Sequence, residues 1–66
     1  MATPVYVDKA DVVAVLRSRE LHGRADWVDK ELPVFIDIMK NAALLGTLDI
    51  DPATLPHFDE EMKQYL

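Results

Sequence analysis

The side chains that could do acid–base or metal chemistry are few and scattered along the chain. His22 and His57 are its two histidines, and a histidine can act as a general base or as a metal ligand. His22 lies in a polar stretch typical of a turn, and His57 lies between Pro56 and Phe58. Neither has a second histidine or a cysteine at ligand spacing, so the sequence predicts no catalytic and no metal site around them.

Carboxylates gather in the second half of the chain, where Asp49, Asp51 and the run 59–61 could offer oxygen ligands to calcium or magnesium. The residue pattern of a helix–loop–helix calcium site is missing. Asp51 is better explained as a helix cap, and the run 59–61 as a solvated helix face on which Asp59 pairs with Lys63. We therefore expect no bound metal and no other cofactor.

Nucleophilic catalysis has little support in the sequence. Ser18 is the only serine, cysteine is absent, and the two glycines cannot supply a phosphate-binding glycine loop. A ligand pocket needs about 300 Å³ of enclosed space, which a domain this small rarely supplies without another subunit. The sequence predicts a non-enzymatic protein.

A DNA-binding helix-turn-helix regulator is one possible function, but the sequence gives it weak support. Two helices around Gly23 would have that outline, and four cations lie on or beside them: Arg17, Arg19, Arg24 and Lys30. Four carboxylates are interleaved with these cations: Glu20, Asp26, Asp29 and Glu31. The local charge is near neutral, so the release of counterions from DNA would add little affinity.

Negative charge belongs mainly to the second half of the chain. Residues 1–32 hold five basic against six acidic side chains, and residues 33–66 hold two against six, which gives net charges of −1 and −4. Such a chain repels phosphate backbones and anionic lipid, so we expect neither a nucleic-acid nor a membrane partner. A basic protein partner is electrostatically easier, which suggests an acidic neutraliser of the antitoxin or immunity type.

The start of the chain indicates a cytoplasmic location. MATPVYV lacks the basic and apolar regions of a secretory signal. The longest apolar segment is interrupted by Asp37, Lys40 and Asn41, well short of the roughly 18 uncharged residues that a bilayer crossing needs. We therefore expect a soluble protein.

The first half of the chain predicts an extended arm followed by two helices. Residues 3–7 are β-branched and aromatic, as in an arm or an edge strand. Asp8 can cap a helix from Lys9 to Arg19, Gly23 marks a tight turn, and a second helix runs from Arg24 to Leu32. Apolar residues align on one face of each helix: Val12, Val13, Val15 and Leu16 on the first, and Leu21, Ala25, Val28 and Leu32 on the second.

Residues 34–48 are expected to form a third, unusually apolar helix. It begins at Pro33 or is capped by Asp37, and Gly46 ends it. On a helical wheel its apolar residues span about 200°, twice the usual stripe: Val34, Phe35, Ile36, Ile38, Met39, Ala42, Ala43 and Leu45. After Asp51 and Pro52 restart the helical pattern, an amphipathic helix from Leu55 completes the chain.

The predicted fold is one all-α domain spanning residues 1–66. It has three to four helices: an αα-hairpin, the apolar third helix and a short C-terminal helix, preceded by the extended arm. A chain of 66 residues buries only about 60% of its unfolded surface, and this one has no disulfides to compensate. Oligomerisation or a partner chain is the remaining source of stability.

We therefore predict a small protein–protein interaction module, either a homo-oligomer or an accessory subunit of a larger assembly. Trp27 lies off the buried stripe beside Arg24, which could lie on its ring, so the indole either closes the core of the same chain or anchors a partner. Phe58, Met62 and Tyr65 either dock on their own chain, with exchange between protomers left open, or enter a partner's groove. The predicted interface comprises Trp27, Phe35, Ile38, Leu44, Leu45, Leu48, Phe58, Met62 and Tyr65.

Overall fold

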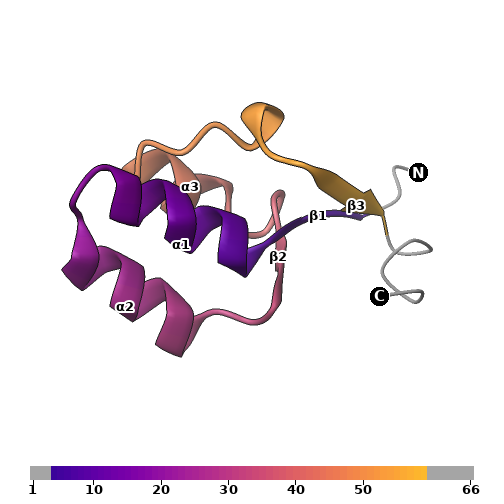
Figure 1. The fold of residues 1–66 in the computed structure, drawn as a ribbon. Helices are drawn as coiled ribbons and strands as arrows, with labels where there is room; N and C mark the ends of the chain where they lie inside the picture. Colours follow the sequence, from indigo (N-terminus) through magenta and orange to yellow (C-terminus); the bar gives the residue numbers. More distant parts are fainter. Residues whose placement is uncertain (1–3, 60–66) are drawn as a thin grey trace.

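The fold is mixed α/β, so the all-α prediction is wrong. The computed structural model describes residues 4–59, and within them three α-helices accompany a three-stranded antiparallel sheet (Figure 1). The elements follow in the order β1 (Val5–Asp8), α1 (Lys9–Ser18), α2 (His22–Glu31), β2 (Phe35–Asp37), α3 (Ala42–Thr47), the 3₁₀ helix η1 (Pro52–Thr54) and β3 (His57–Asp59).

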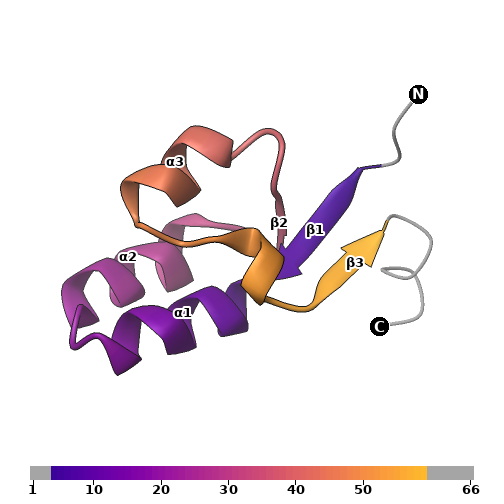
Figure 2. The ribbon, with the colours of Figure 1, turned by 90° about the horizontal axis from the view of Figure 1, so that it is seen from above.

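The αα-hairpin is confirmed. The Asp8 carboxylate accepts a hydrogen bond of 2.8 Å from the backbone N–H of Ala10, so it caps α1 as predicted. Figures 1 and 2 show α1 and α2 side by side and antiparallel. The predicted stripes supply the buried residues between them, with Val12 and Leu16 from α1 meeting the core around Ala25 and Val28 from α2.

The turn between the two helices lies at residues 19–21 and not at Gly23, which belongs to the first turn of α2. Glu20 adopts a left-handed conformation with φ of 63°. Its N–H donates to the carbonyl of Arg17, and the N–H of Leu21 donates to that of Leu16, both at 2.9 Å. These two bonds define a Schellman motif, which satisfies the last carbonyls of α1.

β1 is the central strand of the sheet and not an arm or an edge strand. The strand order is β2-β1-β3, and both pairings are antiparallel. Val7 lies opposite Ile36 on one side and His57 on the other. Val7 and Ile36 are fully buried, so this face of the sheet belongs to the core. β1 continues directly into α1, as Figure 2 shows, so the sheet fixes where the hairpin begins.

Residues 34–48 do not form one helix, and this is the main error in the predicted fold. They form β2, a turn and the short α3. The Asp37 carboxylate accepts hydrogen bonds from the N–H groups of Met39 (2.9 Å) and Lys40 (3.0 Å), which closes a turn at the point where the helix was predicted to continue. The wide apolar arc therefore separates into a strand that buries Ile36 and a helix that buries Leu45.

α3 ends in a second Schellman motif, three residues beyond Gly46. Asp49 is left-handed with φ of 56°, its N–H donates to the carbonyl of Gly46, and the N–H of Ile50 donates to that of Leu45. Gly46 itself lies within the helix, so it does not end it as predicted. Leu45 and Ile50 are both buried, which supplies the apolar contact that accompanies this motif.

The segment after α3 returns to the sheet, so the predicted C-terminal helix does not begin at Leu55, and residues 55–59 are not helical. Asp51 caps η1 by accepting a hydrogen bond of 3.0 Å from the N–H of Ala53, and Pro52 occupies the first helical position. The role of Asp51 as a helix cap was therefore predicted correctly, but the helix that it caps, η1, has only three residues. Phe58 lies in β3 opposite Tyr6. Met62 and Tyr65, which the prediction placed on the same helix, lie outside the described residues.

Candidate functional site

Three large apolar side chains lie exposed among residues 4–59. The exposed fractions are 46% for Trp27 in α2, 58% for Val34 before β2 and 80% for Met39 after β2. Val34 and Met39 flank β2 in the chain, and Trp27 lies on α2, the element that precedes this strand. We refer to Trp27, Val34 and Met39 as the Trp27 surface.

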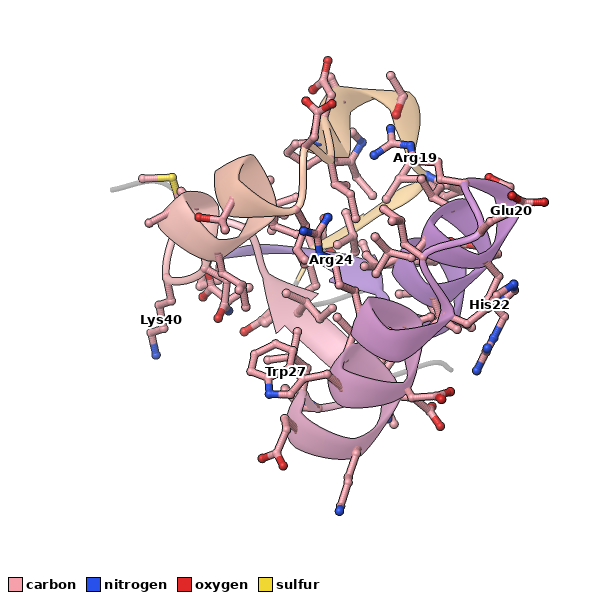
Figure 3. All side chains as sticks on the ribbon, turned by 90° about the vertical axis from the view of Figure 1, so that its left-hand side faces the viewer. Arg19, Glu20, His22, Arg24, Trp27 and Lys40 are labelled. Carbon is pink, nitrogen blue, oxygen red and sulfur yellow. The ribbon has the colours of Figure 1, made fainter. Side chains whose placement is uncertain are left out.

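The position of Trp27 follows from the packing of the hairpin. Ala25 and Val28 point into the core, and a residue next to Val28 on a helix projects about 100° away from it. Trp27 therefore cannot share the buried stripe. Figure 3 shows it on the side of α2 turned away from α1. The sequence left two roles open for Trp27, namely closing the core of its own chain or anchoring a partner. This placement favours the role of a partner anchor.

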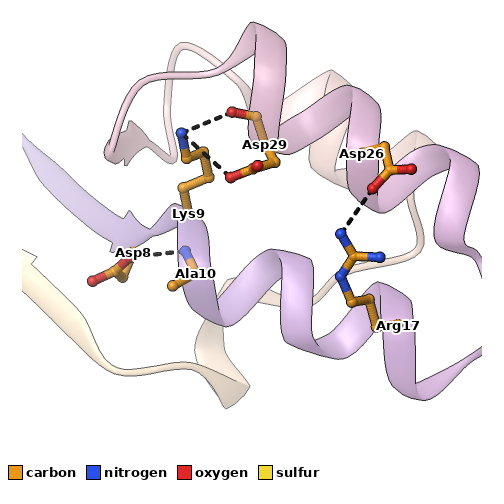
Figure 4. A network of polar contacts seen from close by, with 6 residues as sticks. All are labelled: Asp8, Lys9, Ala10, Arg17, Asp26 and Asp29. Atoms are coloured by element: carbon orange, nitrogen blue, oxygen red, sulfur yellow. Dashed lines mark hydrogen bonds and ion pairs between the residues drawn. The ribbon is translucent and has the colours of Figure 1, made fainter.

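Two ion pairs hold α1 and α2 in register on the opposite side (Figure 4). The guanidinium of Arg17 lies 2.8 Å from the carboxylate of Asp26. The ammonium of Lys9 lies 3.8 Å from the carboxylate of Asp29 and donates a hydrogen bond of 2.9 Å to its backbone carbonyl. Exposed pairs of this kind contribute little stability, but they occupy four of the charges that the sequence offered for binding.

The cations near Trp27 are differently placed. Within the described part of the chain, the ion pairs are the two above, so Arg24, Lys30 and Lys40 take part in none. Figure 3 shows Arg24 extending toward α3 and Lys40 projecting from the far side of the Trp27 ring. Arg24 does not lie over the indole, so the suggested stacking of these two side chains is not made.

Many of the carboxylates have local structural roles. Asp8 and Asp51 cap helices, and Asp37 closes the turn after β2. Asp26 and Asp29 belong to the ion pairs between the helices. Three of these carboxylates are thus engaged by backbone N–H groups and two by cations of α1.

The predicted interface residues are divided between core and surface. Leu45 and Leu48 lie in the core of their own chain. Ile38 and Leu44 are half-buried and pack against that core. Only Trp27 of the predicted set is both large and well exposed among the described residues, whereas Val34 and Met39 are equally prominent and were not in the set. Strand alternation would place Val34 on the same face as the buried Ile36, so this pattern did not mark Val34 as exposed.

Phe35 and Phe58 belong to an aromatic cluster on the other face of the sheet. The ring of Phe35 meets that of Tyr6 edge-on at a centroid distance of 6.5 Å and that of Phe58 at 5.8 Å. Edge-to-face pairs at such distances are favourable. Tyr6 and Phe35 have further interactions, and all three rings are half-buried. It joins all three strands.

Residues 4–59 contain no group of three or more histidines, cysteines or acidic residues arranged to hold a metal ion, and they enclose no pocket. His22 and His57 are both exposed. None of the helices in this part of the chain is long and apolar enough to cross a membrane.

Comparisons with protein-family models, with curated proteins and with solved structures find no match to this chain.

Proposed function

We propose that this protein is a small non-enzymatic interaction module that binds a second protein chain through the Trp27 surface. The second chain is either another copy or a larger protein to which this one is an accessory subunit. The observation that supports the proposal is the exposure of Trp27, whose side chain is 46% exposed on a helix that packs on the core through Ala25 and Val28.

Tryptophan is among the residues that contribute most to binding when a partner covers them. It offers a large apolar area, and fixing its side chain costs little conformational entropy because only two torsions are frozen. Val34 and Met39, one before and one after β2, expose further apolar area. The unbranched Met39 can adapt its shape to a partner.

The acidic neutraliser of a basic protein is the second proposal, and it receives less support. Asp26 and Asp29 are already paired with cations, and three further aspartates cap turns or helices. The helix-turn-helix proposal is weakened in the same way, because Arg17, one of its four candidate DNA-binding cations, is paired with Asp26. For all three proposals the proposed location is the cytoplasm, which fits a chain without cysteine.

The test is whether the Trp27 surface drives association of the purified protein. We expect the wild-type chain to self-associate in sedimentation velocity or, if its partner is a different protein, to remain a monomer that binds a hydrophobic dye such as anilinonaphthalene sulfonate. Trp27→Ala should reduce whichever signal is present at least severalfold, while Trp27→Phe retains most of it.

Circular dichroism and the unfolding midpoint serve as the control, because removing a side chain that is 46% exposed should change stability little. A folded, strictly monomeric chain that binds no dye would refute the proposal. So would a dye or association signal that Trp27→Ala leaves unchanged.

A further inference from the structure

The charge around Trp27 is opposite in sign to that of the chain as a whole. Arg24 lies one helical turn before Trp27 on α2, and Lys40 follows Met39 in the turn after β2. Figure 3 shows the two cations on different sides of the indole. Glu31, one turn after Trp27, is a carboxylate on the same flank of α2. The Asp37 carboxylate lies in the same turn as Lys40 and accepts a hydrogen bond from its backbone N–H. With Lys30, which is also on α2, three cations stand against these two carboxylates in a chain whose net charge is −5.

These cations are unused by the fold. Lys9 and Arg17 form ion pairs, and Arg19 donates to the carbonyls of Leu48 and Asp49. Arg24 and Lys40 have neither an ion pair nor a side-chain hydrogen bond within residues 4–59.

We propose that the natural occupant of the Trp27 surface is an acidic peptide segment of a different protein, an inference that rests on the proposed function. One apolar side chain of that segment covers Trp27, and carboxylates on either side of it meet Arg24 and Lys40. Arginine and carboxylate can form two parallel hydrogen bonds, which would also fix the orientation of the segment.

A second copy of this chain fits the same surface poorly. In a twofold dimer the same patch contributes from both protomers, so one interface would hold the excess cations of both copies. Like charges gathered at an interface oppose association and select against that partner. The charge arrangement therefore favours a foreign acidic segment over self-association.

A selection from random peptides tests this directly, because the surface itself then chooses the chemistry of its ligand. A phage-displayed library of random 12-residue peptides is selected on the immobilised full-length chain, after depletion on the Trp27→Ala variant. The bound peptides are sequenced, and the most enriched one is synthesised. Its affinity is then measured through the fluorescence of Trp27, the only tryptophan in the chain.

We expect the selected peptides to combine an aromatic or aliphatic residue with a net negative charge. Binding should shift the emission of Trp27 to shorter wavelength. The double variant Arg24→Gln, Lys40→Gln should lose roughly tenfold or more in affinity, and added salt should weaken the wild-type complex. Arg17→Gln is the matched control, because it removes one cation on the α1 side and should leave peptide affinity unchanged.

The other outcomes each decide a separate point. If the Trp27-dependent peptides are neutral or basic, the proposal of an acidic partner is wrong. It is also wrong if the double variant binds the peptide as tightly as the wild type does. Either result leaves the proposed function standing. Tighter binding of a single-stranded oligothymidylate than of the selected peptide overturns the acidic partner in favour of nucleic acid. Recovery of no Trp27-dependent peptide, together with a monomer that binds no dye, overturns the interaction module itself.

Discussion

The guanidinium of Arg19 donates a hydrogen bond of 2.8 Å to the backbone carbonyl of Asp49, thirty positions further along the chain. The same nitrogen lies 3.3 Å from the carbonyl of Leu48. Arg19 is the C-cap residue of α1, and Leu48 is that of α3, so one side chain connects the ends of two helices. A cation at a helix C-terminus is also favoured by the helix dipole.

Replacing Arg19 by alanine should lower the free energy of unfolding by about 1 kcal/mol, because two carbonyls lose a charged donor while water can partly replace it. The loss should be local. We expect the amide hydrogens of Leu48, Asp49 and Ile50 to exchange faster with solvent, and those of α2 to be unchanged. Hydrogen exchange followed by nuclear magnetic resonance would measure both.

Arg24→Ala is the matched control for this prediction, since Arg24 is an exposed arginine on α2 without a side-chain hydrogen bond within residues 4–59. It should affect stability by less than about 0.5 kcal/mol. Equal losses in the two variants would show that Arg19 does not hold α3.

Glu20→Gly should stabilise the protein by about 1 kcal/mol. Glu20 holds a positive φ at the end of α1, which is costly for any residue with a Cβ and is free for glycine. Asp49→Gly should gain less, because aspartate tolerates the left-handed region better than glutamate does. Urea unfolding of the two variants would rank them.

Glu20→Ala separates the backbone effect from the loss of the carboxylate, because alanine keeps the Cβ. It should gain far less than glycine does. A gain in Glu20→Ala equal to that in Glu20→Gly would attribute the effect to charge and not to the left-handed backbone.

Ile36 and Met39 were assigned to the same apolar helix face by the sequence pattern, and the structure separates them completely. Ile36 is fully buried in β2, whereas Met39 is 80% exposed. Ile36→Val should therefore cost about 0.5–1.5 kcal/mol of stability. Met39→Ala should cost less than about 0.5 kcal/mol even though it removes more atoms. Similar losses at the two positions would contradict the strand assignment.

Asp8→Ala should destabilise the protein by about 1 kcal/mol, because the N–H of Ala10 loses its partner at the start of α1. Asp8→Asn retains an oxygen acceptor at the same place and should recover most of that loss. Thermal unfolding of both variants would show whether the cap or the negative charge matters. An asparagine variant as unstable as the alanine variant would point to the charge.

The helical hairpin could be predicted from the sequence because its signals are local. Asp8 caps the first helix within two residues of itself, and the apolar spacing of each helix lies within a single segment. The start of α1 was predicted near Lys9, and the helix begins at that residue. Asp51 was identified as a cap for the same reason.

The sheet could not be predicted in this way, because each strand has only three or four residues and depends on distant partners. Residues 35–38 are apolar enough to suit either a strand or a buried helix, and the choice is made by pairing with Val7. The candidate site also combines a residue predicted from local spacing with residues whose positions depend on strand pairing. Trp27 was found from its helical position, but Val34 and Met39 reach the surface only because β2 exists.

The central position of β1 has a kinetic consequence. Val7 pairs with Ile36 and with His57, so the strand that is synthesised first must wait for the last described strand before the sheet is complete. Contacts between residues so far apart in sequence slow folding, because long loops must close before the contacts form. The chain should therefore fold more slowly than a helical bundle of the same length. Until β3 arrives, the backbone groups with which β1 will bind it are open to pairing with another molecule.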